Sequence, residues 1–242
     1  MGAVYAAKAK ASRASAKRVA VKVGARGRQL RIDGTFASLY RPGNTTTGSV
    51  WDALAAPILL LPASHRRSVL ILGLGGGSAA RIVRALAPRA RIVGIELDPE
   101  VVRAAKRWFD LDELGIEVVV GDAHGYLRRA RRQFDVVLED VFVGRGRGVH
   151  KPEWLLQEGL ELAARRVAHG GLLVSNAIDE APAVARTLRR HFPSTLRIDV
   201  EGYDNRILVG GPRPLTGRAL RRAVTSSPIL GGATAMMRFR QI

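Results

Sequence analysis

Ser68–Asp98 has the sequence SVLILGLGGGSAARIVRALAPRARIVGIELD, and this stretch decides the fold. The continuous apolar run Val69–Leu72 predicts a buried strand, which glycines follow directly. The helical stretch Ala79–Leu86 comes next and stops before Pro88, and Ile92–Ile95 predicts a second buried strand. Two buried strands joined by a helix form a βαβ unit, which is typical of a parallel sheet.

The alternation of strands and helices continues on both sides of this unit. Further elements are expected at Trp51–Leu61 (helix), Pro99–Phe109 (helix), Ile116–Val120 (strand), Phe134–Leu138 (strand), Glu153–Val167 (helix) and Leu172–Ala177 (strand). Thr195–Val200 and Arg206–Val209 predict an antiparallel hairpin that closes the edge of the sheet. The predicted fold class is α/β, a Rossmann-like sandwich with a mostly parallel sheet, helices on both faces and an antiparallel C-terminal hairpin.

A small β appendage is predicted ahead of this sandwich. Val19, Val21 and Val23 alternate with other residues, as in a half-buried strand, and Asp33-Gly34 indicates a hairpin turn. We therefore expect three parts: a basic disordered arm at 1–16, a small N-terminal β appendage at 17–48 and the main domain at 49–242.

The charge of the chain is strongly positive and unevenly distributed. Of its 242 residues, 39 are Lys or Arg and 21 are Asp or Glu, which gives a formal net charge of +18. Residues 1–31 hold nine of the basic residues and no acid. The basic arm is therefore suited to binding polyanions.

Several classes of function are excluded by what the sequence lacks. The chain has no cysteine, which rules out disulfides, zinc–thiolate sites, iron–sulfur clusters and thiol catalysis. Its five histidines show no metal-ligand spacing, so we expect no metal. No apolar run approaches the roughly 18 residues of a membrane-spanning helix, and the N-terminal stretch has no secretory signal pattern, so we expect a cytoplasmic protein that does not enter a membrane.

Gly73, Gly75 and Gly77 follow the first buried strand with the spacing G-x-G-x-G. Glycines let the chain turn sharply and let a ligand approach the backbone at the start of a helix. The dinucleotide fingerprint G-x-G-x-x-G fails because its last position is Ser78, and the phosphate-loop ending is absent. The looser pattern is similar to motif I of class I S-adenosylmethionine methyltransferases, and we expect the three glycines to bind a nucleoside donor.

Carboxylates follow the next two strands. Glu96 lies 19 residues after Gly77, where a carboxylate can accept hydrogen bonds from both hydroxyls of a ribose. Asp122 stands in Gly121-Asp122-Ala123, where it can accept an adenine amino proton, cap the next helix, or do both. Because the carboxyl ends of parallel strands share one edge of the sheet, the sequence predicts a nucleoside site there that includes Ala123.

The fourth buried strand runs into Glu139 and Asp140, and here the chain resembles the spermidine synthases (polyamine aminopropyltransferases). The resemblance covers roughly residues 30–210. The segments that follow the family's order and spacing are Val69–Val83, Val93–Val102, Gly121–Ala123 and Phe134–Asp140.

The resemblance implies a class I methyltransferase sandwich in which residues 49–242 are the catalytic domain. It implies that Glu96 binds the ribose, and Asp122 the adenine, of decarboxylated S-adenosylmethionine. It further implies that Asp140 orients and deprotonates the attacking amine. Glu139 stands next to Asp140, and we expect it to act at the transfer position as well.

Four departures from the family pattern concern the groups that hold cationic amines. The family has an Asp in its glycine loop, a second Asp three residues after the first, a Tyr-His pair and a Gln, where this chain has Gly76, Val143, Val50-Trp51 and Ala37. We therefore expect a poor spermidine synthase that keeps the nucleoside half of the site.

The loop after Asp140 contains Arg145, Arg147, His150 and Lys151, four potential cations. The fold implies that this loop faces the acceptor, where cations suit an anionic or nucleic-acid acceptor better than a diamine, unless the loop is simply solvated.

Three functions therefore stay open. They are a divergent aminopropyltransferase, an S-adenosylmethionine-dependent methyltransferase acting on an anionic or nucleic-acid-associated acceptor, and a non-catalytic nucleoside- or RNA-binding protein. The first two use decarboxylated S-adenosylmethionine or S-adenosylmethionine as a small-molecule donor, together with a nucleophilic acceptor. A homodimer is also left open.

Overall fold

The computed structural model describes residues 18–212 and 214–242, so the expected basic arm at 1–16 lies outside the described residues. The strands are β1 (Val19–Gly24), β2 (Gly27–Ile32), β3 (Thr35–Tyr40), β4 (Ser68–Leu72), β5 (Arg91–Glu96), β6 (Glu117–Val120), β7 (Phe134–Glu139), β8 (Val167–Ala177), β9 (Ser194–Val200), β10 (Arg206–Gly211) and β11 (Met237–Gln241). The α-helices are α1 (Val50–Ala55), α2 (Ser78–Leu86), α3 (Pro99–Trp108), α4 (Ala123–Arg129), α5 (Leu160–Arg165), α6 (Ala181–His191) and α7 (Gly217–Thr225). A π-helix spans Leu155–Gly159, and 3-10 helices span Ala56–Leu60, Ala63–His65, Asp112–Leu114, Gly146–Gly148 and Gly231–Met236.

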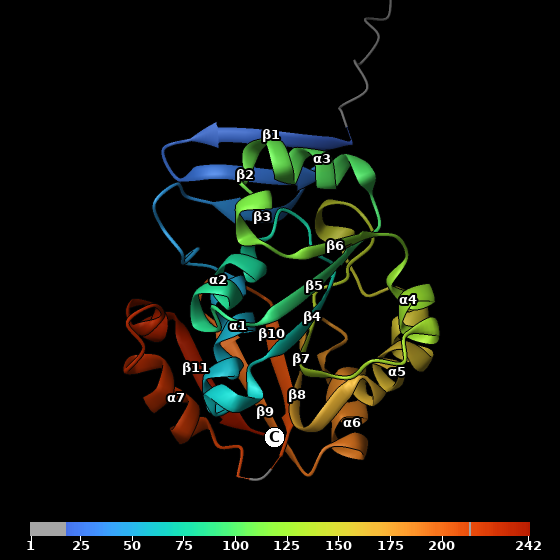
Figure 1. Cartoon of the computed structure of the whole chain (residues 1–242), viewed down its shortest axis with the longest axis vertical. Coiled ribbons are helices and arrows are strands. Elements are labelled where there is room, and N and C mark those ends of the chain that lie inside the picture. The colour runs from blue at the N-terminus through green and yellow to red at the C-terminus, as the bar shows by residue number, and fades with distance from the viewer. Residues whose placement is uncertain (1–17, 213) are drawn as a thin grey trace, which may run out of the picture.

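An eight-stranded sheet forms the centre of the molecule (Figure 1). Its strand order is β11-β9-β10-β8-β7-β4-β5-β6, and β8, β7, β4, β5 and β6 pair in parallel. β10 is antiparallel to both of its neighbours. The predicted α/β fold is confirmed: a mostly parallel sheet with an antiparallel C-terminal part.

One expectation about the edge of this sheet is wrong. The hairpin of β9 and β10 does not close the sheet, because β11 pairs with the outer side of β9. The chain returns to this edge through α7, whose Leu220 and Val224 are buried in the core together with Met237 of β11. This C-terminal packing positions β11 at the edge of the sheet. The five residues of β11 alone do not predict a strand there.

Alternate residues of the central strands point to opposite faces of the sheet, as the period of two in a strand requires. Ile71 of β4 packs in the core formed with α1, α2 and α7, whereas Leu70 and Leu72 pack in the core formed with α4, α5 and α6. Because helices bury both faces, these strands read as continuous apolar runs.

Two expected helices have different bounds in the structure. The helix expected at Trp51–Leu61 ends as α1 at Ala55 and continues as a 3-10 helix that contains Pro57. The helix expected at Glu153–Val167 is divided between the π-helix and α5, and β8 begins at Val167. No helix in 18–212 or 214–242 is long and apolar enough to cross a bilayer.

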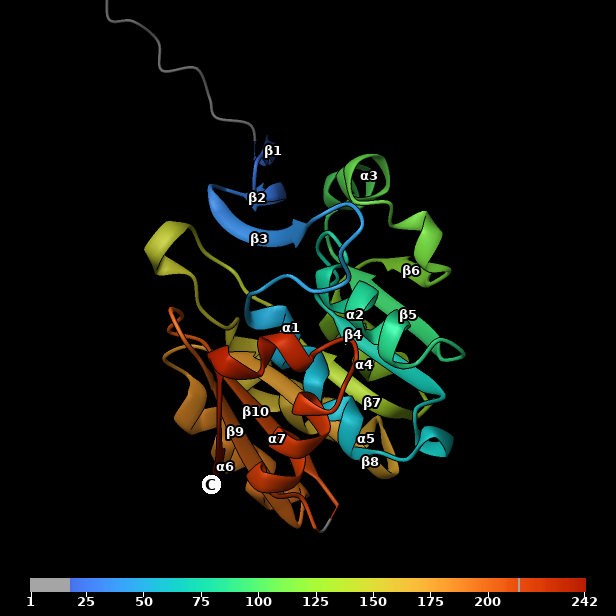
Figure 2. The same cartoon turned by 90° about the vertical axis from the view of Figure 1, so that its left-hand side faces the viewer.

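The N-terminal appendage is a three-stranded antiparallel sheet in the order β1-β2-β3. Leu30 and Tyr40 of this sheet pack against Val101 and Phe109 at α3. Ser78, the residue that breaks the dinucleotide fingerprint, joins the appendage to α2, since its Oγ accepts from the N–H of Leu39 and donates to the Leu39 carbonyl, both at 2.9 Å. The appendage therefore lies over the carboxyl ends of the parallel strands (Figures 1 and 2).

Candidate functional site

A cleft of about 680 Å³ lies between the appendage and the carboxyl ends of the parallel strands. Most of the residues expected at the site line it: Gly73, Gly75, Glu96, Asp122, Ala123 and Asp140. The β2–β3 turn, residues 141–144 and the β9–β10 turn form its other walls. The structure thus gathers at one edge of the sheet side chains that the sequence placed after separate strands, as expected for an open α/β sheet.

The glycine loop after β4 makes the tight turn that its sequence predicts. Gly73 has φ +81°, and a Cβ there would lie 2.6 Å from the Asp140 carbonyl oxygen. Gly75 has φ +54°, and its N–H donates to Glu96 Oε2 at 2.8 Å. Both positions therefore require glycine, and the loop keeps its backbone open to the cleft.

Gly77 differs from its two neighbours in the motif because it does not line the cleft. It is the N-cap of α2 with φ +82°, and a Cβ there would lie 2.7 Å from Leu111 Cδ1. Gly76 also faces packed atoms, since its Cβ would lie 2.8 Å from Ser38 Cβ and 3.0 Å from Phe109 Cδ1. The expected donor contact of Gly77 is therefore corrected to a helix-packing role, and position 76 has no room for the family's Asp.

Glu96 ends β5 with its side chain almost buried, at 8% relative exposure, and it lines the cleft. Its two carboxylate oxygens accept backbone N–H groups, one from Gly75 at 2.8 Å and one from Asp98 at 3.1 Å. Burial raises the pKa of this carboxyl, and the two backbone hydrogen bonds oppose the rise. A carboxylate offers about four lone-pair sites, so these contacts leave Glu96 able to accept hydrogen bonds from a ligand.

Asp98 and Asp122 cap the helices that follow β5 and β6. Asp98 accepts from the N–H of Glu100 at 2.8 Å at the start of α3. Asp122 accepts from the N–H of His124 at 3.2 Å and of Gly125 at 2.9 Å at the start of α4. Both acids also line the cleft. The capping role of Asp122 is present, and it is compatible with the predicted contact to adenine.

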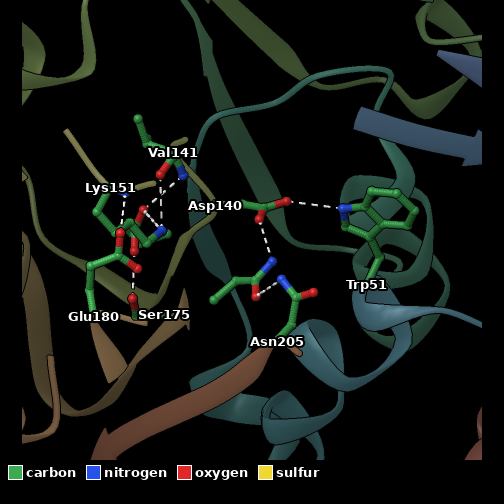
Figure 3. Close-up of polar contacts among 9 residues, drawn as sticks. Trp51, Asp140, Val141, Lys151, Ser175, Glu180 and Asn205 are labelled. Atoms are coloured by element: carbon green, nitrogen blue, oxygen red, sulfur yellow. Dashed lines mark hydrogen bonds and ion pairs between the residues drawn. The ribbon is translucent and has the colours of Figure 1, made fainter. Parts of the chain in front are cut away.

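Asp140, directly after β7, is held by side chains from two distant elements (Figure 3). Its Oδ2 accepts from Trp51 Nε1 at 3.0 Å, and its Oδ1 accepts from Asn176 Nδ2 at 2.7 Å. Asn205 Nδ2 in turn donates to Asn176 Oδ1 at 2.9 Å, which fixes the orientation of that amide. This chain of donors holds the Asp140 carboxylate at the end of the cleft.

The surroundings of Asp140 raise the pKa of its carboxyl to about 6. Burial is the largest cause, and the charge of Glu139 acts in the same direction. The charge of Lys151 and the hydrogen bonds from Asn176 and Trp51 lower it in part. The group is therefore mostly ionised at neutral pH yet basic enough to accept a proton, as a general base must be.

Glu139 does not share the cleft with Asp140, which corrects the expectation that both acids act at the transfer position. Neighbouring residues of a strand point to opposite faces, so the side chain of Glu139 is fully buried on the other side of β7. There it pairs with the fully buried Lys151 Nζ at 2.7 Å and accepts from the N–H of Val141 at 2.7 Å and Ser175 Oγ at 2.5 Å (Figure 3). Lys151 also donates to the Val141 carbonyl at 3.0 Å.

The loop at 141–150 lines the cleft, as expected, but Arg145 and the adjoining Lys151 do not. Lys151 is neutralised by Glu139, and Arg145, although exposed, forms an ion pair with Asp33 of the appendage at 3.4 Å. The N–H of Gly146 donates to Thr35 Oγ1 at 2.9 Å. These contacts join the loop to the appendage across the cleft. The prediction that Arg145 and Lys151 present positive charge to the cleft is wrong.

The cleft is acidic although the chain is basic. Its lining includes five acids and two arginines: Asp33, Glu96, Asp98, Asp122, Asp140, Arg18 and Arg31. A cationic ligand is therefore favoured here, contrary to what the net charge of +18 suggested. No cluster of three or more potential metal ligands occurs within the described part of the chain.

Three site residues were missed by sequence reasoning. Trp51 entered only as a departure from the family pattern, and Asn176 and Asn205 were not considered. The place of Asn176 near the carboxyl end of β8, in the same sheet edge as Asp140, was a signal that could have identified it. For Trp51, 89 residues away from Asp140 in sequence, there was no local signal.

The chain is similar in sequence to proteins named as transferases. Residues 69–171 match the family model described as a methyltransferase domain. The polyamine aminopropyltransferase of Vibrio vulnificus is 30% identical over 179 residues, which cover 72% of this chain and 55% of that protein. The eEF1A lysine and N-terminal methyltransferase of Danio rerio is 30% identical over 155 residues, or 59% of this chain and 22% of that protein. The chain thus spans about half of the first of these relatives and less of the second.

The fold is shared with a solved structure over most of both chains. A probable spermidine synthase from Corynebacterium glutamicum superposes with a TM-score of 0.70 at 20% identity, covering 92% of this chain and 87% of that one. This likeness includes the small appendage as well as the sandwich, because 92% of 242 residues exceeds the length of the main domain alone.

Proposed function

We propose that the chain, which has the class I methyltransferase fold, is a spermidine synthase-like transferase that moves the aminopropyl group of a sulfonium nucleoside to an amine. The observation that carries this proposal is the carboxylate of Asp140, held by Trp51 and Asn176 at the end of an acidic cleft. An acid with a pKa of about 6 in this position suits an amine nucleophile.

The donor half of the proposed site consists of the glycine loop, Glu96 and Asp122. We propose that the two oxygens of Glu96 accept the ribose hydroxyls and that Asp122 accepts the adenine amino group, while Gly73, Gly75 and Ala123 allow close approach of the nucleoside. The sulfonium would then lie between this half and Asp140. The five acids of the cleft favour its positive charge.

In the proposed reaction, the nitrogen of the acceptor amine attacks the carbon next to the sulfonium. The new carbon–nitrogen bond forms as the carbon–sulfur bond breaks, and the sulfur leaves with the electron pair as a neutral thioether, methylthioadenosine. The positive charge moves from sulfur to nitrogen, close to the carboxylate of Asp140, which takes up the excess proton. Holding the two reactants in line provides most of the rate enhancement, since the sulfonium is already an activated leaving group.

This proposal is tested by steady-state kinetics with decarboxylated S-adenosylmethionine and a set of amines. Asp140→Asn should abolish transfer and leave binding of methylthioadenosine within about threefold, because the variant removes the base and not the donor half. Asp112→Asn, at an exposed acid paired with Lys106, is the matched control and should keep wild-type rates. Transfer that survives in Asp140→Asn would overturn the assignment of the base.

A second candidate function is methyl transfer from S-adenosylmethionine. It is favoured by position 76, where packing against Ser38 and Phe109 leaves no room for the acid that the aminopropyltransferase pattern places there. In this reaction the donor keeps its carboxylate, and Asp140 takes the proton from the methylated nucleophile. The same cleft would hold the nucleoside.

Calorimetric titration with S-adenosylmethionine and its decarboxylated analogue, side by side, separates the two functions. The aminopropyltransferase proposal predicts a preference of at least tenfold for the decarboxylated donor, about 1.4 kcal/mol. The opposite preference would assign methyl transfer. Failure to bind either donor would overturn both proposed reactions and favour a non-catalytic protein.

A further inference from the structure

The lining of the cleft is mostly apolar on the side of Asp140 formed by the loop after β7 and the β9–β10 turn. Val143 and Tyr203 line this end, and 40% and 37% of their surface is exposed. Val143 lies three residues after Asp140 and is fixed by paired backbone hydrogen bonds of 2.9 Å with His150. Tyr203 lies in the β9–β10 turn, two residues before Asn205.

Five apolar residues from three segments line this end of the cleft. Asp140 is the acid that lies beside them. The lining residues in question are Phe142, Val143, Val149, Ile178 and Tyr203. Of the other four lining acids, three lie at the carboxyl ends of β5 and β6, and Asp33, in the β2–β3 turn, is already paired with Arg18 and with Arg145 of the adjoining loop. We call this set of five apolar residues the apolar wall.

Among the described residues, no charged group at the apolar wall other than Asp140 is placed to pair with a second cation. Arg145 and His150 are on the adjoining loop, and both are basic. Glu180 is close to Lys151, but its Oε1 accepts from the Lys151 N–H at 2.7 Å and its side chain does not line the cleft. Asp179, Glu201 and Asp204 lie near the same end, and none of them lines the cleft either.

A diamine acceptor would place its second ammonium against the apolar wall while its first reacted at Asp140. Desolvating an ammonium without a counter-charge is unfavourable, whereas a hydrocarbon stem gains from the same contact. We infer that the acceptor is a monoamine on an apolar stem: its one nitrogen arrives protonated, gives that proton to Asp140 and then attacks with the freed lone pair, and this inference rests on the proposed aminopropyl transfer. A free alkylamine and a lysine side chain both have this chemistry.

Butylamine and putrescine test the inference because they differ only in the terminal ammonium. With decarboxylated S-adenosylmethionine as donor, the wild-type protein should use butylamine with a kcat/KM at least tenfold above that for putrescine. Hexylamine should have a higher kcat/KM than butylamine, since its longer stem covers more of the apolar wall. A peptide with one internal lysine, assayed beside the free amines, distinguishes the two sources of the stem.

Val143→Asp supplies the decisive variant because it places a counter-charge on the apolar wall. It should lower the ratio of butylamine to putrescine at least tenfold, by raising the efficiency with putrescine. Val23→Asp, at an exposed valine of β1 outside the cleft, is the matched control and should keep the wild-type ratio. If Val143→Asp does not fold, Tyr203→Glu makes the same change from the opposite turn.

The outcomes separate this inference from the proposed function. Transfer to amines with a wild-type preference for putrescine, or a ratio unmoved by Val143→Asp and Tyr203→Glu, overturns the inference and leaves the aminopropyltransferase proposal standing. Absence of transfer to any amine, with the donor bound, overturns the proposed function and the inference together.

Discussion

Replacing Lys151 by methionine should both destabilise the protein and change the titration of Asp140. Lys151 and Glu139 are fully buried, and their Nζ–Oε1 distance is 2.7 Å. Lys151 Nζ also donates to the Val141 carbonyl and lies 3.9 Å from the centre of the Phe142 ring. Methionine has a similar volume, so the variant removes the charge and its hydrogen bonds while the packing changes little.

The expected loss of stability follows from leaving Glu139 without its counter-charge. Removing one partner of a buried ion pair costs about 3–5 kcal/mol. For a chain of this size, each kcal/mol lowers the melting temperature by about 2–4 °C, so a fall of about 6–20 °C is expected. The double variant Glu139→Gln/Lys151→Met removes both charges and should recover most of this loss, because replacing a buried pair by neutral groups is close to neutral.

The effect on activity has a definite sign. The charge of Lys151 lowers the pKa of Asp140, which burial has raised to about 6. Lys151→Met should therefore raise that pKa further, and the acidic limb of the pH profile of kcat/KM should move to higher pH. The double variant also removes Glu139, whose charge raises the pKa of Asp140, so its shift should be smaller.

Calorimetric melting and a pH profile from 5 to 9 measure these effects on the same three proteins. A melting temperature of Lys151→Met within about 2 °C of wild type would refute the uncompensated buried charge. An unshifted acidic limb, in a folded Lys151→Met, would refute the electrostatic coupling between this pair and Asp140. A merely structural role of Lys151 would lower stability and leave the pH profile in place.

Other predictions concern the rest of the site and the arm. Glu96→Ala should weaken binding of methylthioadenosine about tenfold or more in a titration, since removing a buried acceptor costs roughly 1–3 kcal/mol; unchanged affinity would contradict the ribose assignment. In the wild type, kcat/KM should rise with pH through about 6 as Asp140 loses its proton, and a profile that is flat from pH 5 to 7 would exclude Asp140 as the base. Gly73→Ala should lower the melting temperature by several degrees, because its Cβ would lie 2.6 Å from the Asp140 carbonyl oxygen at φ +81°, and an unchanged melting curve would contradict that geometry. Deleting residues 1–16 should leave the melting temperature within about 2 °C, because core periodicity in the sequence starts only at Val19, while salt-dependent binding of a polyanion should weaken; a large fall would show that the arm contributes to the folded core.

The sandwich, and the residues of the proposed donor half of the cleft, could be predicted from the sequence alone. Continuous apolar strands separated by helices dictate a parallel sheet, and the carboxyl ends of parallel strands must meet at one edge. Carboxylates at the ends of such strands, such as Glu96 and Asp122, must therefore lie close together, and this can be predicted without knowing any distant contact. The same holds for Gly73 and Gly75, whose positive φ angles follow from a turn between strand and helix.

The surroundings of Asp140, the proposed acceptor half, could be seen only in the folded chain. The order Glu139-Asp140 shows that the two side chains point to opposite faces, but which one enters the cleft depends on how β7 sits between β4 and β8. Trp51 and Asn176 reach Asp140 from 89 and 36 residues away, and such contacts leave no periodic signal in the chain.

The charge of the cleft could not be predicted from the sequence. Net charge is a sum over the whole sequence, whereas the field in the cleft depends on which side chains line it. Lys151 directly follows the loop that lines the cleft, yet it is fully buried in an ion pair with Glu139 and does not line the cleft. A chain with a formal charge of +18 thus presents an acidic cleft, because folding gathers four carboxylates of the sheet edge and Asp33 of the appendage around it, against two lining arginines.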